Sequence, residues 1–234
     1  MKTGSFPKQP YFTDKEIDRL CIEKLRLFDS LPSSPEPIRI DRFVEKCFGI
    51  VPEYVELPFG VLGYTQFSPK GVESIFVSRS LDEAGDKVSE RRIRTTLAHE
   101  AGHGLLHASL FLFNEPPQSL FPDDVGIEQK KILCRENSVS EKSNNGKNKS
   151  YDGRWWEYQA NRAMGSFLLP VPLVADALSS LLTSEGLLGN KVLQPSNRIK
   201  AEKLLSDIFD VNPVVARIRI DRIFPVKQNE QLTL

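Results

Sequence analysis

The stretch TLAHEAGHGLLH, which ends at His107, contains all three histidines of this 234-residue chain. Residues four positions apart lie on one face of a helix, about 6 Å from each other. On a helix, His99 and His103 can therefore direct their imidazole rings at one ion. Glu100 lies between them, turned so that its carboxylate can reach a water bound to that ion. This HExxH pattern predicts a helix that carries two metal ligands and a carboxylate base.

His107 continues the four-residue spacing of His99 and His103, but helix geometry argues against it as a third ligand. Two steps of four residues climb about 12 Å along a straight helix, which is too far for three side chains to share one small ion. The metzincin pattern solves this with a glycine break and a later histidine, but those positions hold Leu106 and Ser109 here. We expect His107 either to pack at the end of the helix or to orient a ligand from outside.

A catalytic zinc site needs a third protein ligand and an open position for water. With no histidine left, the third ligand should be a carboxylate or a thiolate. The helical stretch WWEYQANRAMGSFLLP offers Glu157, whose neighbours Trp155, Trp156 and Ala160 do not suggest a solvated face. Asn161 shares the face of Glu157 one turn later and could orient a ligand. We therefore expect Glu157 to be the third ligand.

Composition narrows the class of protein. Lys plus Arg equals Asp plus Glu at 31 each, so net charge gives no reason to expect nucleic-acid binding. Cys21, Cys47 and Cys134 are widely spaced and form no CxxC motif, which fits a reducing compartment. The sequence has no run of 18 apolar residues and no apolar segment near its start. We expect a cytoplasmic protein with no membrane segment.

The hydrophobic pattern predicts helices, then a small sheet, then helices. Thr13 and Glu16 form a capping box for a first helix, and Gly49 should stop a second that begins near Ile40. Short β-branched and aromatic runs between residues 53 and 79 predict a meander of three strands. A loop should then lead into the histidine helix, at about 89–109. Further helical patterns occupy residues 154–169, 171–182, 196–209 and 213–224.

This order predicts an α+β fold, with a small three-stranded sheet packed against helices and a zincin-like HExxH helix followed by a C-terminal helical bundle. We divide the chain into an N-terminal helix and linker (1–37), a main domain (38–222) and a tail (223–234). An insertion at about 112–152 interrupts the main domain. Its segment 138–150 is polar and low in complexity, so we expect a mobile loop there.

Several stretches of the chain together resemble the ImmA/IrrE family of metallopeptidases. They are TLAHEAGHGLLH, the stretch EYQANRAMGSFLLP, which looks like the family's ExxAN…LLMP helix, and PIRIDRFVEKCFGI before the expected sheet. AEKLLSDIFDVNPVVARIRIDRI is similar to the family's closing segment, and the resemblance covers roughly residues 38–222. Leu169 replaces the family's methionine, and the spacing from His103 to Glu157 is longer than the family's.

The resemblance implies a zinc metallo-endopeptidase with His99, His103 and Glu157 as ligands and Glu100 as the base. It also implies a substrate class, namely intracellular regulator proteins such as helix-turn-helix repressors. Zn²⁺ is the expected ion and Mn²⁺ is possible. The substrate should lie extended along the sheet edge beside ESIFVS, residues 73–78.

Three alternatives stay open from the residues alone. The site could belong to a non-catalytic zinc-binding regulatory or interaction module, although such a module has no use for Glu100. It could also serve a hydrolase that acts on a small substrate in a closed pocket. Cys134, in the insertion, is either an ordinary free cysteine or a thiolate that occupies the open metal position and inhibits the enzyme.

Overall fold

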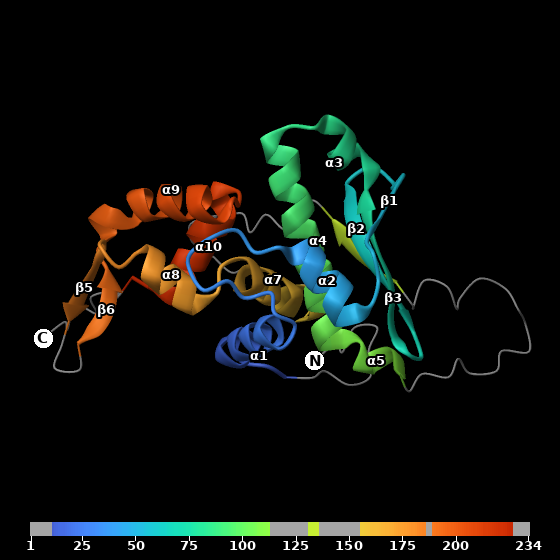
Figure 1. Ribbon diagram of the computed structural model, residues 1–234, viewed down its shortest axis with the longest axis horizontal. Helices are drawn as coiled ribbons and strands as arrows, with labels where there is room; N and C mark the ends of the chain where they lie inside the picture. Colours follow the sequence, from blue (N-terminus) through green and yellow to red (C-terminus); the bar gives the residue numbers. More distant parts are fainter. Residues whose placement is uncertain (1–10, 113–130, 136–154, 186–188, 227–234) are drawn as a thin grey trace, which may run out of the picture.

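The computed structural model describes residues 11–112, 131–135, 155–185 and 189–226, and it is an α+β structure with a small mixed sheet (Figure 1). The long helix α4 (Lys87–His107) lies between the sheet and the other helices (Figure 1). It packs against α7 (Trp155–Leu168) and against strands of the sheet. None of the described helices combines the length and the apolar composition needed to cross a membrane.

The two N-terminal helices confirm the sequence prediction. The helix α1 (Asp14–Leu27) begins at the expected capping box, in which Glu16 Oε2 accepts a hydrogen bond of 2.8 Å from the backbone N–H of Thr13. The helix α2 (Ile40–Phe48) ends at Gly49, whose φ of 71° is left-handed and favours glycine. The apolar face of α1 is fully buried in the same core as α7, so α1 belongs to the same structural unit as the segment after residue 37.

The sheet contains the three expected strands but not as a meander. Its strands are β1 (Glu53–Val55), β2 (Val61–Ser68), β3 (Gly71–Ser78) and β4 (Lys131–Arg135), in the order β1-β3-β2-β4. The predicted meander is wrong, because β2 pairs with β3 along one edge and with β4 along the other. β1 therefore pairs with β3, and this pairing is parallel. β4 lies in the insertion, where no strand was predicted.

This strand order corrects the expected place of the substrate. Residues 76–78 of β3 pair with β1 on one side, and β3 pairs with β2 on the other. ESIFVS is therefore an inner strand over that part rather than a free sheet edge. The outer edge of β4 has no strand partner within the described residues.

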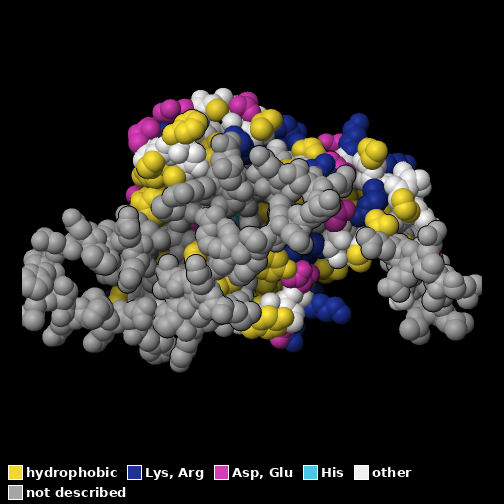
Figure 2. Space-filling view, turned by 180° about the vertical axis from the view of Figure 1, so that it is seen from behind, with side chains coloured by type: hydrophobic (Ala, Val, Ile, Leu, Met, Phe, Trp, Pro, Cys, Tyr) yellow, Lys and Arg dark blue, Asp and Glu magenta, His cyan; other side chains and the backbone are white. Residues whose placement is uncertain are grey.

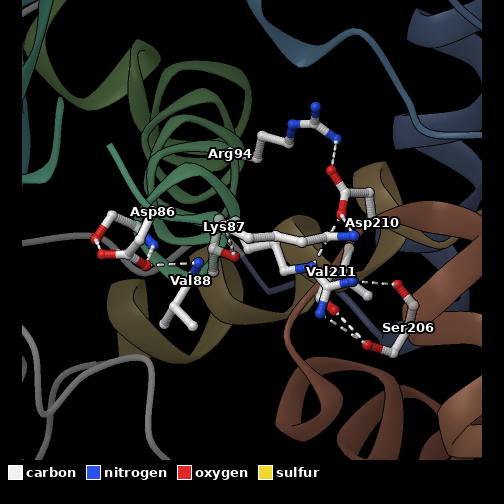
Figure 3. Close-up of polar contacts among 10 residues, drawn as sticks. Asp86, Lys87, Val88, Arg94, Ser206, Asp210 and Val211 are labelled. Carbon is white, nitrogen blue, oxygen red and sulfur yellow. Dashed lines mark hydrogen bonds and ion pairs between the residues drawn. The ribbon is translucent and has the colours of Figure 1, made fainter. Parts of the chain in front are cut away.

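The start of α4 is determined by an aspartate. Asp86 Oδ1 accepts hydrogen bonds from the backbone N–H groups of Val88 at 2.8 Å and Ser89 at 3.0 Å (Figure 3). The helix therefore begins two residues before the predicted position. The segment in front of it, expected to be a loop, contains the short helix α3 (Arg79–Ala84), and α5 (Ser109–Leu112) follows α4.

The described C-terminal residues form three further α-helices, a hairpin and the short 3-10 helix η2 (Pro195–Asn197). The α-helices and strands are α8 (Val171–Ala177), β5 (Leu182–Glu185), β6 (Asn190–Leu193), α9 (Arg198–Phe209) and α10 (Pro213–Ile223). The helix expected at 171–182 is shorter than predicted, because the serine-rich stretch after Leu178 leads into the hairpin instead. The expected tail begins as the last turn of α10, and Phe224 is buried against the core.

One ionic cluster ties α4 to α9. Asp210 caps α9 with a left-handed φ of 50°, and Arg91 Nε donates to its carboxylate at 2.9 Å. Arg94 Nη1 lies 2.8 Å from the other carboxylate oxygen, and Lys87 is nearby (Figure 3). Arg91 also donates to the backbone oxygen of Ser206 at 3.2 Å. These contacts hold the N-terminal half of α4 against the C-terminal helices.

Two sequence predictions fall outside the described residues: the mobile loop at 138–150, and the last residues of the tail, 227–234. On the described part of the face shown in Figure 2, Lys and Arg side chains lie among Asp and Glu side chains.

Candidate metal centre

Small residues bring the two helices of the site together. A Cβ atom on Gly102 of α4 would lie 2.9 Å from the Cβ of Ala163 and 3.1 Å from the backbone oxygen of Ala160, both on α7. Only a glycine therefore permits this close approach. The consequence is that Glu157, in the first turn of α7, faces the histidines of α4.

Three predicted ligands converge at this contact. The Nε2 atoms of His99 and His103 lie 3.0 Å apart. Glu157 places Oε2 at 3.3 Å from Nε2 of His99 and Oε1 at 3.6 Å from Nε2 of His103. Ligands about 2.0–2.1 Å from a tetrahedral ion are separated by about 3.3 Å. The three side chains are buried and together could hold a metal ion.

The neighbours of His99 and His103 fix which ring nitrogen carries hydrogen. Asn161 Oδ1 lies 3.1 Å from Nδ1 of His99, and an amide oxygen only accepts, so this Nδ1 donates. Gln159 Oε1 lies 3.0 Å from Nε2 of His107, which therefore donates too. The Nδ1 of His107 then accepts from Nδ1 of His103, at 3.0 Å.

This arrangement leaves the Nε2 lone pairs of His99 and His103 free of hydrogen beside the carboxylate of Glu157. Burial lowers the pKa of His103 well below its usual range, and the charges of His99 and His107 act in the same direction. Burial also lowers the pKa of His107 to about 4, against the hydrogen bond with Gln159. Both rings are therefore neutral at pH 7. Two imidazole lone pairs at 3.0 Å beside a carboxylate repel one another unless a cation lies among them.

His107 does not belong to the group that could hold a metal ion. It is fully buried, and its Nδ1 lies 3.0 Å from Nδ1 of His103. Asn161 makes the corresponding contact with Nδ1 of His99, so both residues stay predicted to orient the ligands from outside. Gln159 was missed, because nothing in the sequence distinguishes it from an ordinary polar helix residue.

Glu100 lies in the same buried region with one oxygen bonded and the other not. Thr65 Oγ1 donates to its Oε2 at 2.6 Å, whereas its Oε1 has no hydrogen-bond partner. Burial raises the pKa of Glu100 to about 8, helped by the charge of Glu157 and opposed by the charge of His99 and the bond from Thr65. A carboxyl group with a pKa near neutrality can both take and return a proton.

The sheet forms the wall beside Glu100. A Cβ atom on Gly63 would lie 2.6 Å from Cγ2 of Thr96 and 3.6 Å from Oε1 of Glu100, so β2 approaches α4 closely at this glycine. β4 pairs with β2 at this level, where Cys134 lies opposite Gly63. Only the backbone of Cys134 is described, so the two alternatives for it, an ordinary free cysteine and an inhibitory thiolate, both stay predictions.

Comparison of the chain with protein-family models found no match, and comparison with curated proteins found none either. The resemblance to the ImmA/IrrE family therefore stays an expectation from the motifs.

Proposed function

We propose that this protein is a zinc-dependent endopeptidase that hydrolyses peptide bonds in an intracellular protein. The observation that supports this most is the convergence of His99, His103 and Glu157 beside a buried carboxylate, Glu100, that keeps one oxygen unbonded. Two neutral imidazoles and one carboxylate suit Zn²⁺ well, with Mn²⁺ as the second candidate. The motif pattern adds the finer proposal of a zincin-like, ImmA/IrrE-type enzyme with a C-terminal helical bundle.

In this proposal different side chains hold the ion, orient its ligands and transfer the proton. When bound, zinc supplies Lewis-acid chemistry, which polarises the scissile carbonyl and lowers the pKa of water toward about 7. His99, His103 and Glu157 hold the ion, while Asn161 and His107 keep the imidazoles in the required tautomers. Glu100 takes a proton from the attacking water and returns it to the leaving amine.

An extended substrate needs a strand edge with free backbone groups. β3 does not provide it over residues 76–78, because β1 and β2 flank it there. We therefore move the proposed substrate to the outer edge of β4, the strand that pairs with β2 next to Glu100. Main-chain hydrogen bonds along such an edge hold a peptide without demanding one sequence.

A non-catalytic zinc-binding regulatory module is the second candidate. It would use the same ligands, and its partner would bind without being cut. The raised pKa of Glu100 and its bond to Thr65 favour the peptidase, because a purely structural zinc site needs no such group. We place the peptidase in the cytoplasm, with a helix-turn-helix repressor as the proposed substrate and no direct contact with nucleic acid.

The test uses the full-length zinc-loaded protein and the helix-turn-helix repressors encoded beside it. Intact-mass spectrometry should show one defined cut with the wild type and none with Glu100→Gln, while zinc content stays the same in both. Glu90→Gln changes an exposed glutamate of the same helix and should cut normally. Cleavage by Glu100→Gln at the wild-type rate would contradict the mechanism. Binding of a repressor without any cut would favour the regulatory module.

A further inference from the structure

The hydroxyl of Thr65 makes the two carboxylate oxygens of Glu100 different. Thr65 Oγ1 lies 2.6 Å from Oε2 and 3.2 Å from the backbone oxygen of the same glutamate. A hydroxyl has one hydrogen to donate, and the shorter contact, to Oε2, is the stronger bond. Oε1 is buried and has no hydrogen-bond partner.

The surroundings keep this pair in place. Thr65 is fully buried in the middle of β2, and Glu100 is fully buried on α4. Gly63 lets the two elements approach so closely that a Cβ atom there would collide with Thr96. The carboxylate of Glu100 therefore has little room to turn, and its one hydrogen bond to the sheet leaves Oε1 unbonded, beside Gly63 of β2.

We propose that Thr65 is a positioning residue for the base, which anchors Oε2 of Glu100 and leaves Oε1 as the atom that takes the proton. This inference rests on the proposed peptidase function. In the step it describes, an O–H bond of the attacking water breaks and its proton forms a bond to Oε1. The resulting hydroxide forms a C–O bond to the scissile carbonyl carbon. The C–N bond of the peptide then breaks as the proton passes from Oε1 to the leaving amine nitrogen, and the new carboxyl group stays on the other product. Thr65 keeps its own hydrogen throughout.

Two variants of Thr65 separate the effect of its hydroxyl on catalysis from the effect of its side-chain shape. Thr65→Val removes the hydroxyl and keeps the branched shape that a strand favours, whereas Thr65→Ser keeps the hydroxyl. We expect Thr65→Val to lower kcat by about 10- to 100-fold, because general-base catalysis contributes about 10²–10⁴-fold and only its orientation is lost. KM and zinc content should not change, since the described hydrogen-bond contacts of Thr65 go to Glu100, which is not a predicted ligand. Thr65→Ser should restore most of kcat.

Thr95→Val is the matched control. The Thr95 hydroxyl is also buried, but it donates only to the backbone oxygen of Arg91 within α4, at 2.7 Å. Its loss should leave kcat unchanged. In a Glu100→Gln background, adding Thr65→Val should cause no further loss, because the two residues act as one unit. The probe is a quenched fluorescent peptide library incubated with each zinc-loaded, full-length variant.

Crystal structures of the zinc-loaded wild type, Thr65→Ser and Thr65→Val provide a readout besides activity. The carboxylate of Glu100 should have one orientation in the first two and a turned or split orientation in Thr65→Val. An unchanged carboxylate in Thr65→Val, or an unchanged kcat, would overturn the inference and leave the peptidase standing. If the wild type cleaves no peptide, the peptidase itself is wrong and the base role of Oε1 with it. The crystal structures would then still decide whether Thr65 orients the carboxylate.

Discussion

Nε2 of His107 lies 3.0 Å from Oε1 of Gln159, and this contact connects α7 through His107 to the Nδ1 side of His103, a predicted ligand. Gln159 accepts the hydrogen of His107, so His107 must in turn accept from His103. The lone pair of His103 on the side of Glu157 thus depends on a glutamine that bonds His107 rather than His103.

Gln159→Leu should therefore weaken metal binding. Without the acceptor, His107 and His103 lose their fixed tautomers, and changes to such orienting residues cost about 10- to 100-fold in metal affinity. Competition with a zinc chelator measures the affinity. Gln194→Leu, on the segment after the C-terminal hairpin, removes a glutamine far along the chain from the ligands and should bind zinc normally. Equal affinities for the two variants would contradict the relay.

Glu157→Ala should abolish stoichiometric zinc binding. Glu157 is the one predicted ligand that comes from α7, and two imidazoles alone leave the ion short of a protein ligand. We expect the zinc affinity to fall by more than about 100-fold. Elemental analysis after dialysis gives the metal content, with Glu90→Ala on the exposed side of α4 as the control. Retention of one zinc per chain by Glu157→Ala would mean that the third ligand lies elsewhere.

Gly102→Ala should destabilise the protein and weaken the metal site together. The new Cβ atom would lie 2.9 Å from Cβ of Ala163, so α4 and α7 must move apart at a cost of about 1–3 kcal/mol. Gly165→Ala on α7 is the control, because its Cβ atom would meet Arg219 Cδ at an ordinary 3.6 Å. There the loss of glycine should stabilise the helix by about 0.5–1 kcal/mol. Urea unfolding measures the free energy of unfolding of both variants. Equal destabilisation by Gly102→Ala and Gly165→Ala would contradict the inference that only a glycine fits at position 102.

Asp210→Asn should lower the free energy of unfolding at pH 7 but change it little in acid. Burial raises the pKa of Asp210, but the hydrogen bond from Arg91 and the charges of Arg94, Arg91 and Lys87 outweigh it and hold the pKa below its usual value. The folded-state pKa is thus below the unfolded one. The carboxylate's contribution is therefore present above the unfolded pKa and lost as the pH falls through the folded pKa.

We expect Asp210→Asn to lower the free energy of unfolding by about 1–3 kcal/mol at pH 7. Asparagine tolerates the left-handed φ of 50°, so the variant tests the charge and not the backbone. Urea unfolding at pH 7 and near pH 3 should show the difference from wild type shrinking in acid. Asp221→Asn, in an exposed pair with Arg198, should change stability by less than about 1 kcal/mol. A difference for Asp210→Asn that does not depend on pH would rule out the charge as its cause.

Metal should stabilise the wild type. Bound zinc would relieve the repulsion among the acceptor atoms of His99, His103 and Glu157, and an ion that binds only the folded state adds stability as its concentration rises. We expect a higher Tm with zinc and a lower one after chelation. The double variant His99→Ala, His103→Ala should lose this response. A zinc-dependent Tm in that variant would place the responsive site elsewhere.

Local signals predicted much of the helical structure. The Thr13 capping box and the left-handed Gly49 stop are short-range chemistry, so α1 and α2 form where the sequence places them. Glycine, serine and proline also mark where many of the helices end. The order of the strands could not be predicted in this way, because an alternation of apolar and polar residues predicts a strand but not which strand pairs with it. The partners of β2 are residues 71–78 and 131–135, and the second pairing joins strands that are separated in the sequence by the whole of α4.

The sequence by itself determined the candidate ligands and the candidate base: two histidines one helical turn apart, a glutamate between them and a second glutamate fifty-odd residues later. Helix periodicity, a local property, was enough to separate His107 from the two predicted ligands. Only the tertiary structure decided that Gly102 lets α4 meet α7, that Gln159 orients His107, and that Thr65 bonds Glu100. Those contacts join residues 35 to 61 positions apart, and packing between elements, rather than the pattern within any one of them, brings such residues together.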